Sequence, residues 1–199
     1  MRSPVPTGWG RLEPRVRAMV SPTRWRHIQG VVETARELAR RFGLDEGRAA
    51  VAALLHDAAR DWPLSRLTAT LAEAGERLSP LEQASPELLH GPAAAHWARA
   101  HLGVDDGPVL DAVRYHTTGR PGMSPLEMVL VVADYSEPGR EFAEAAAIRE
   151  AARQSLEGAC LLSLDARLRY LLDRGHPIHP RTVEARNWLL MRRASGCRA

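Results

Sequence analysis

Apolar residues recur at spacings of three and four along most of the chain, which is the period of an amphipathic helix. The clearest stretch begins after Ser21-Pro22 and ends at Gly43. Its apolar positions are Trp25, Ile28, Val31, Val32, Ala35, Leu38 and Phe42. No stretch alternates apolar and polar residues with a period of two, so no strand is predicted. The fold class predicted is therefore all-α.

Capping and breaking residues divide this pattern into segments of helical length. Ser21 followed by proline, and Asp45 further on, are typical residues at helix starts. Helices are expected over 11–20 with an interruption at Pro14, 22–42, 49–59, 64–74, 93–102, 109–115, 125–134, two within 141–174 that separate near Ser155, and 180–191. Residues 1–10 contain prolines and glycines and are expected to be a flexible leader, followed by a single domain over 11–195.

The composition is that of an ordinary globular protein: 45% of the 199 residues are hydrophobic and 26% are charged. No apolar run has the length of a membrane span or of a signal peptide. Cys160 and Cys197 lie far apart and do not suggest a disulfide framework, so a reducing cytoplasm is expected. All 27 basic residues are arginine, and the net charge of +3 does not by itself demand a nucleic acid, although arginine suits a phosphate ligand.

The stretch Leu54-Leu55-His56-Asp57 places two adjacent polar residues at the end of an apolar run. An unpaired imidazole or carboxylate in a core costs a few kcal/mol or more. A metal ion is a partner that suits both, and this pair of donors favours zinc, iron, manganese or nickel over calcium and magnesium. A local hydrogen bond between the two side chains is the alternative.

Further residues with metal-binding side chains stand beside helical apolar patterns. They are His27, His90, His116 and Asp134. Taken singly, His27 could be a half-buried helix residue, and Asp134 could pair with an arginine. Six donors on separate segments together suggest a metal-dependent hydrolase. The remaining histidines, His96, His101, His176 and His179, are assigned structural or solvent roles.

The segment after His116 carries a second kind of chemistry. It reads Thr117-Thr118-Gly119-Arg120-Pro121-Gly122 and offers backbone N–H groups, two hydroxyls and a guanidinium. Such groups bind phosphate oxygens. An ordinary polar turn is the alternative.

The order His…His-Asp…His…His…Asp on an all-α chain resembles that of the HD-domain phosphohydrolases. Within that superfamily the chain is similar to the YqeK family of bacterial symmetrical bis(5′-nucleosyl)-tetraphosphatases. The likeness spans about residues 21–188. The segments that carry it are Arg24-x-x-His27, Leu54-Leu55-His56-Asp57, Leu89-His90-Gly91-Pro92, Tyr115-His116-Thr117-Thr118-Gly119-Arg120, Ala133-Asp134-Tyr135-x-Glu137-Pro138-Gly139-Arg140 and Ile178-His179-Pro180-x-Thr182-x-Glu184-Ala185-Arg186-Asn187.

The resemblance implies an HD-domain helical bundle with a dinuclear metal site in its core. The metals implied are two divalent ions, with iron expected and manganese, cobalt or nickel also suited to these donors. One ion would be held by His27, His56, Asp57 and Asp134, and the other by His90 and His116, with Asp57 bridging.

The implied reaction is the hydrolysis of diadenosine tetraphosphate to two ADP by a metal-activated water. Catalytic roles would fall to Asp57 and Arg60, and substrate contacts to Arg60, Thr117, Thr118, Gly119, Arg120 and Arg140. The expected partner is a small dinucleoside polyphosphate or nucleotide, with no membrane and no nucleic acid, and a homodimer is left open.

The chain departs from the family pattern at three positions. Ala58 and Arg60 stand where the family usually has tyrosine and lysine, and Ser136 where it has isoleucine. Arg60 keeps the charge but not the shape of lysine. Two other functions remain open at this point: an HD-type phosphohydrolase of another nucleotide, and a non-catalytic arginine-rich module that binds RNA.

Overall fold

The computed structural model describes residues 9–196, and the side chains of 10–193. Within this range the chain is helical and contains no strand, which confirms the expected all-α class. The helices are α1 (Trp9–Arg17), α2 (Pro22–Arg41), α3 (Glu46–Leu55), α4 (Leu64–Glu73), α5 (Pro80–Ala84), the 3₁₀ helix η1 (Pro86–Leu88), α6 (His90–Leu102), α7 (Gly107–Tyr115), α8 (Pro125–Ser136), α9 (Ala145–Gln154), α10 (Leu156–Asp173) and α11 (Pro180–Gly196). None of these helices is both long and apolar enough to cross a membrane.

The helix starts follow the capping residues seen in the sequence. The Ser21 hydroxyl accepts the N–H of Arg24 at the start of α2, and the Asp45 carboxylate accepts the N–H of Arg48 at the start of α3. These caps satisfy N–H groups that have no partner within the helix. Ser155 caps α10 and separates it from α9, as expected.

The start of the chain differs from the expectation in two ways. Most of the expected leader, residues 1–8, lies outside the described residues, and Gly10 already belongs to α1. The expected interruption at Pro14 is wrong, because α1 continues through it to Arg17. Proline removes one hydrogen bond from a helix interior. The Pro14 carbonyl still accepts the N–H of Ala18 at 3.1 Å, and Val16 is fully buried, so packing holds the helix in place.

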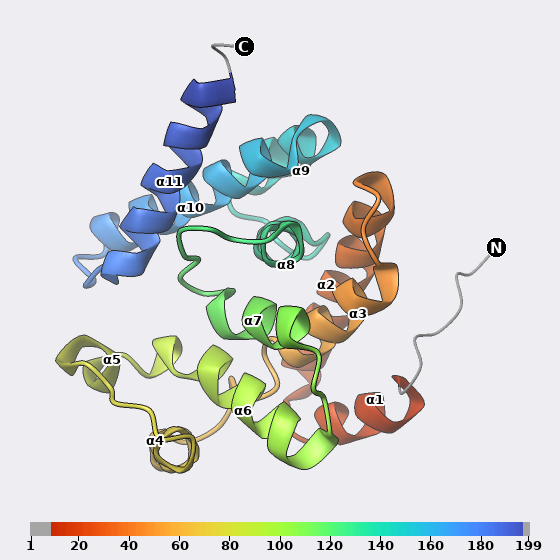
Figure 1. The fold of residues 1–199 in the computed structure, drawn as a ribbon, viewed down its shortest axis with the longest axis vertical. Coiled ribbons are helices and arrows are strands. Elements are labelled where there is room, and N and C mark those ends of the chain that lie inside the picture. The colour runs from red at the N-terminus through yellow and green to blue at the C-terminus, as the bar shows by residue number, and fades with distance from the viewer. Residues whose placement is uncertain (1–8, 197–199) are drawn as a thin grey trace.

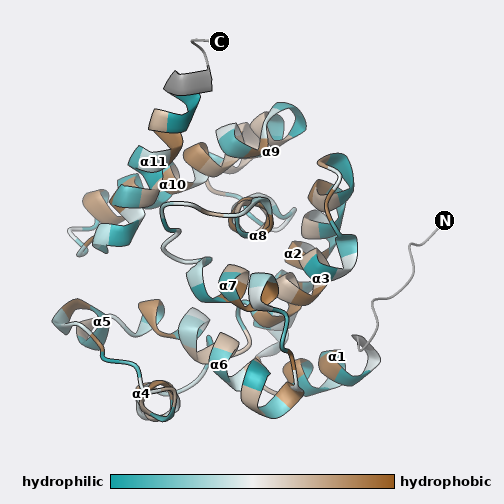
Figure 2. Cartoon of the chain, viewed as in Figure 1, coloured by the Kyte–Doolittle hydropathy of each residue, from teal (hydrophilic) through white to brown (hydrophobic). Residues whose placement is uncertain are grey.

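Helix α8 lies at the centre of the bundle. Figure 1 shows it end-on, surrounded by α2 and α3, by α7, and by α9 and α10. The eight residues from Leu126 to Ala133 are buried without interruption, and all of them except Glu127 are apolar. A helix that is apolar all round belongs in a core. The outer helices α10 and α11 carry both hydrophobic and hydrophilic residues (Figure 2).

The position of α8 determines where the polar donors can meet. Asp134 lies two residues before its C-terminal end. The helices α2 and α3 pack against each other and against α8, and α3 also packs against α7 and α6. His27 lies within α2, His90 begins α6, and His116 follows α7 directly. The bundle therefore brings one end of several helices to the same buried point.

Candidate metal centre

His56 and Asp57 lie in a tight turn at the end of α3. The expectation of a helix through Ala59 is wrong, because the α-helix ends at Leu55. Beyond it the N–H of Arg60 bonds to the Asp57 carbonyl at 3.0 Å, a bond between residues three apart. Such bonds close a narrower turn than the α-helix does. His56 Nε2 then lies 3.5 Å from Asp57 Oδ2.

Three histidines share the same hydrogen bond on the outer side of the ring. In each, Nδ1 lies 2.7 Å from the backbone carbonyl of the residue three positions earlier. The pairs are His56 with Ala53, His90 with Glu87 and His116 with Val113. A carbonyl can only accept, so Nδ1 carries the proton and Nε2 of the neutral ring is free to bind a metal. The backbone thus selects the tautomer and the direction of all three rings.

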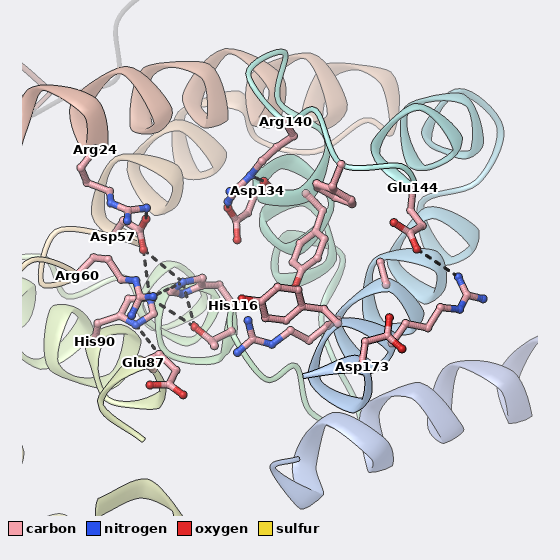
Figure 3. A pocket seen from close by; sticks show the side chains of 17 residues that line it. Arg24, Asp57, Arg60, Glu87, His90, His116, Asp134, Arg140, Glu144 and Asp173 are labelled. Atoms are coloured by element: carbon pink, nitrogen blue, oxygen red, sulfur yellow. Dashed lines mark hydrogen bonds and ion pairs between the residues drawn. The ribbon is translucent and has the colours of Figure 1, made fainter. Parts of the chain in front are cut away.

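Asp57 lies between two pairs of histidines. Its Oδ1 is 3.1 Å from His90 Nε2 and 3.9 Å from His116 Nε2. Its Oδ2 is 3.5 Å from His56 Nε2 and 3.7 Å from His27 Nε2. The two oxygens of one buried carboxylate therefore face two different groups of nitrogen donors. Figure 3 shows Asp57 next to His90 and His116 on one side of the cavity.

His27 is oriented by a carboxylate instead of a carbonyl. Its Nδ1 lies 3.1 Å from Glu137 Oε1, and its Nε2 lies 3.1 Å from Asp134 Oδ1 and 3.4 Å from His56 Nε2. Glu137 is buried and also accepts the N–H of Gly139 at 2.6 Å. A carboxylate behind a ligating histidine fixes the ring and raises its basicity.

Gly30 makes room for Glu137 against α2. A Cβ added at Gly30 would lie 2.6 Å from Glu137 Oε2, closer than such atoms approach in proteins. Any larger residue would therefore displace the carboxylate that orients His27. Gly91 makes room in the same way beside His90 and His116. A Cβ added at Gly91 would lie 2.9 Å from the Val113 carbonyl oxygen and 3.2 Å from the His116 ring.

Asp134 pairs with an arginine, the alternative that the sequence left open, and it also contacts the imidazole of His27. Beside its contact with His27, its Oδ1 accepts a hydrogen bond from Arg140 Nη2. Arg140 also donates from Nε to the Asp134 carbonyl at 2.7 Å. The ion pair with an arginine is thus present together with the contact to an imidazole. A carboxylate has lone pairs enough for both.

The protonation of the cluster suits a metal. Burial lowers the pKa of His56, and burial together with neighbouring His90 and His56 lowers the pKa of His116 to about 3. Burial alone would raise the pKa of Asp57, but the surrounding histidines hold it well below its usual value. Neutral imidazoles and ionised carboxylates are the forms that bind metals.

His27 is the exception among the imidazoles. Burial works against its charged form, but the contacts with Asp134 raise its pKa above the usual value. Asp134 shows the reverse effect: burial opposes ionisation, and His27 and Arg140 keep its pKa low. A metal ion at His27 would have to displace a more firmly held proton than at His56 or His116.

The donors form two groups that share Asp57. The ligand atoms of His27, His56 and Asp57 lie within 4.8 Å of one another, and so do those of Asp57, His90 and His116. Imidazole rings whose Nδ1 already has a hydrogen-bond partner, together with carboxylate oxygens, are the donor set of a divalent transition metal. The residues present therefore fit a divalent metal site; Asp134, which the resemblance assigned to the ion at His27 and His56, is not part of either group of three and reaches the cluster through its contact with His27.

A cavity of about 480 Å³ opens beside the cluster. Of the residues expected to contact substrate, Arg60, Thr117 and Arg140 line it. The Thr117 hydroxyl lies 3.2 Å from His116 Nε2. Among the described residues, Arg60 is exposed and has no ion-pair partner.

The other three expected contacts do not line this cavity. Thr118 is buried, and its hydroxyl donates to the Gly119 carbonyl at 2.9 Å. Gly119 has a φ of +64°, which glycine adopts readily. Arg120 binds Glu127 through Nε at 2.7 Å, and its guanidinium lies over the Tyr115 ring, 4.4 Å from the centroid. In this structure Thr118, Gly119 and Arg120 support the loop instead of facing the cavity.

Two residues that touch the cluster, Arg24 and Glu137, had no role predicted from the sequence. Arg24 Nη1 lies 2.6 Å from Asp57 Oδ2, and Glu137 orients His27 as described. Helical spacing carried a signal for Arg24, because it lies three residues before His27 and so shares its helix face. The partner of Glu137 lies 110 residues away, and no local pattern connects them.

A helical bundle in which the aspartate of a His-Asp pair lies between further histidines is the arrangement of an HD-domain protein. Residues 24–139 match the family model described as HD domain. The symmetrical bis(5′-nucleosyl)-tetraphosphatase of Bacillus subtilis is 38% identical over 175 residues, which are 88% of this chain and 94% of that protein. The protein of the same name from Halalkalibacterium halodurans is 38% identical over 176 residues, with coverage of 88% and 94%.

A solved structure agrees with these relatives. The crystal structure described as a predicted HD superfamily hydrolase involved in NAD metabolism, from Clostridium acetobutylicum, matches with a TM-score of 0.89 and 36% identity, over 92% of this chain and 97% of that one. This chain belongs to the symmetrical bis(5′-nucleosyl)-tetraphosphatase family of HD-domain hydrolases, which confirms the resemblance noted in its sequence.

Removing the Asp57 carboxylate should weaken metal binding by both groups of donors, because this residue belongs to both. We expect Asp57→Ala and His56→Ala to abolish hydrolysis and to lower the metal content, with the larger loss in Asp57→Ala. His96→Ala, outside both groups, should change neither. Elemental analysis of the purified variants measures this, and unchanged metal in Asp57→Ala would disprove the shared position.

Disturbing Glu137 should weaken metal binding at the His27 side. Loss of an outer carboxylate typically costs 10- to 100-fold in metal affinity, so we expect about that effect for Glu137→Ala. Gly30→Ala should act in the same direction by displacing Glu137. Gly107→Ala is the matched control, because nothing lies within 4 Å of an added Cβ there. Equal metal affinities for Gly30→Ala and Gly107→Ala, from titration with a chelator, would contradict this role.

Proposed function

We propose that the protein hydrolyses diadenosine tetraphosphate, and related dinucleoside tetraphosphates, symmetrically to two nucleoside diphosphates. The observation that carries the proposal is Asp57, one buried carboxylate facing two groups of histidines at the wall of a cavity with arginines. The names of the relatives from Bacillus subtilis and Halalkalibacterium halodurans support this substrate over another nucleotide and over RNA binding.

We propose two divalent ions, iron in the first place, with manganese, cobalt or nickel as substitutes. His27, His56, Asp57 and Asp134 would hold one, and Asp57, His90 and His116 the other. When bound, such a pair of metals lowers the pKa of a water and neutralises charge on the phosphate oxygens. The donor atoms are held by their outer hydrogen bonds before any ion arrives, so little reorganisation is needed.

The arginines of the cavity would bind the phosphate chain. Arg60, without an ion-pair partner among the described residues, can turn its whole guanidinium to the substrate. Arg140 is held against Asp134, and its position is therefore defined before substrate binds. Thr117 adds a hydroxyl beside His116. Guanidinium groups bind phosphate oxygens in pairs of hydrogen bonds, which orients the chain as well as neutralising it.

The reaction itself transfers one ADP half of the substrate to water and releases the other half as the leaving group. Water attacks the second phosphorus from one adenosine, and the bond from that phosphorus to the oxygen that bridges it to the third phosphorus breaks. The departing ADP takes this oxygen, and the other ADP keeps the attacked phosphorus. Arginines at the cavity wall stabilise the negative charge that grows on the leaving diphosphate. We place the enzyme in the cytoplasm, as its cysteine content suggested, and the homodimer stays an open prediction.

Product analysis tests the proposed reaction directly. ADP should be the sole early product from diadenosine tetraphosphate, and in ¹⁸O-water one of the two ADP molecules should carry the label on its terminal phosphate. Chromatography and mass spectrometry of samples from the first few per cent of turnover measure both. Early AMP and ATP in equal amounts would show attack at the first phosphorus and would refute symmetrical cleavage.

Arg60 should be needed for its charge. Arg60→Ala should lower kcat/KM about 10²-fold or more, the scale of one electrostatic contact in the transition state, whereas Arg60→Lys should keep most of the activity. Arg26→Ala, an exposed arginine outside the cavity, is the control. Small and equal effects of both Arg60 variants would remove this residue from the active site.

A further inference from the structure

The cavity extends beyond the metal centre to residues that the proposed chemistry does not use. Figure 3 shows Asp57 and His90 on one side, Asp134 and Arg140 between, and Glu144 and Asp173 on the far side. The far wall is built from the segment before α9 and from α10, and includes Phe142 and Tyr170. None of these far residues touches a metal-binding side chain, so the metal site does not explain them.

Two aromatic rings at the far wall are unusually exposed. Phe142 is 36% exposed and Tyr170 is 50% exposed, although both line a cavity. Phe142 is held edge-to-face against Tyr135, with ring centroids 5.9 Å apart and an interplanar angle of 87°. The Arg174 guanidinium lies over the Tyr170 ring, 4.7 Å from its centroid. Rings already held in place lose little freedom when a flat ligand covers them.

The charges along the cavity differ between its two ends. Arg24, Arg60 and Arg140 line the part near the metal centre. The far end carries the carboxylates Glu144 and Asp173 together with Arg167 and Arg169, and Arg169 lies 3.8 Å from Glu144. The divalent metals proposed for the first part would attract a phosphate chain to it, whereas the second part has two arginines against two carboxylates and no net charge. An uncharged, flat group suits the far end.

We propose that Phe142 and Tyr170 form a nucleoside subsite, in which the base of one nucleoside diphosphate half of the substrate stacks while its phosphates extend to the metal centre. The choice of a nucleotide as the ligand rests on the proposed function. Bases stack on aromatic side chains with about 1–3 kcal/mol each, which is about 5- to 150-fold in a dissociation constant. Tyr135 also lines the cavity, where it supports the Phe142 ring edge-to-face.

The test compares a probe with a base and a probe without one. We would measure the binding of ADP and of inorganic tripolyphosphate by calorimetry, in the metal-loaded wild-type protein and in Phe142→Ala and Tyr170→Ala. The Kd for ADP should rise about 5- to 150-fold in both variants. The Kd for tripolyphosphate and the metal content should stay unchanged, because neither depends on stacking.

Two variants keep the result interpretable. Tyr170→Phe retains the ring and should bind ADP as the wild type does. Leu172→Ala, on the same helix and 65% exposed but outside the cavity, should also leave the Kd for ADP unchanged. An unchanged Kd for ADP in the alanine variants, or an equal rise for both probes, would overturn the subsite.

The subsite and the proposed reaction can fail separately. Selective loss of ADP binding in the alanine variants would support the subsite even if the wild type failed to release ADP from diadenosine tetraphosphate, an outcome that would refute only the reaction. Conversely, symmetrical cleavage with unchanged KM in Phe142→Ala and Tyr170→Ala would support the reaction and overturn the subsite.

Discussion

The buried carboxylate of Asp57 is the constraint on which the rest of the structure depends. It is 4% exposed, and an ionised carboxylate in such a place is costly unless it is paired. Its partners come from α2, from the starts and ends of α3, α6 and α7, and include Arg24 at 2.6 Å. Arg24 donates to Asp57, whereas His56, His90 and His116 turn unprotonated Nε2 atoms toward it, so all of these groups must keep their places for the two groups of donors to share one carboxylate. The packing of the bundle thus places residues of α2 and the ends of α3, α6 and α7 around one carboxylate.

Small residues make this convergence sterically feasible. Four alanines of α3, Ala49, Ala50, Ala52 and Ala53, are buried, so neighbouring helices can approach its backbone closely. Gly91 allows the start of α6 to lie against the last carbonyls of α7, which sets His90 beside His116 with Nε2 atoms 3.0 Å apart. Gly30 does the same for Glu137 behind His27. One glycine thus serves each group of donors.

The features that the sequence predicted correctly are those that depend on residues close together in the chain. Helix positions follow the apolar spacing and the caps at Ser21, Asp45 and Ser155, and the donor types follow from polar residues placed against apolar runs. Local patterns failed where tertiary packing decides: α1 continues through Pro14, and α3 ends four residues early. Arg120 looked like a phosphate contact because it follows two threonines and a glycine, yet Glu127 and Asp111 engage it.

The cavity's arginines differ in what they do before substrate arrives, and this difference indicates why a polyphosphate suits the site. Arg24 pairs with Asp57 and Arg140 pairs with Asp134, so the two carboxylates that face the histidines are already balanced by two guanidinium groups. These carboxylates therefore do not neutralise the positive charge of a bound divalent metal. The guanidinium of Arg60 adds a further positive charge to the cavity. In a partly enclosed cavity such an excess attracts a multiply charged anion strongly. A neutral or singly charged ligand would leave most of it unpaired, whereas a tetraphosphate chain, with a charge on every phosphate, can neutralise it along its whole length.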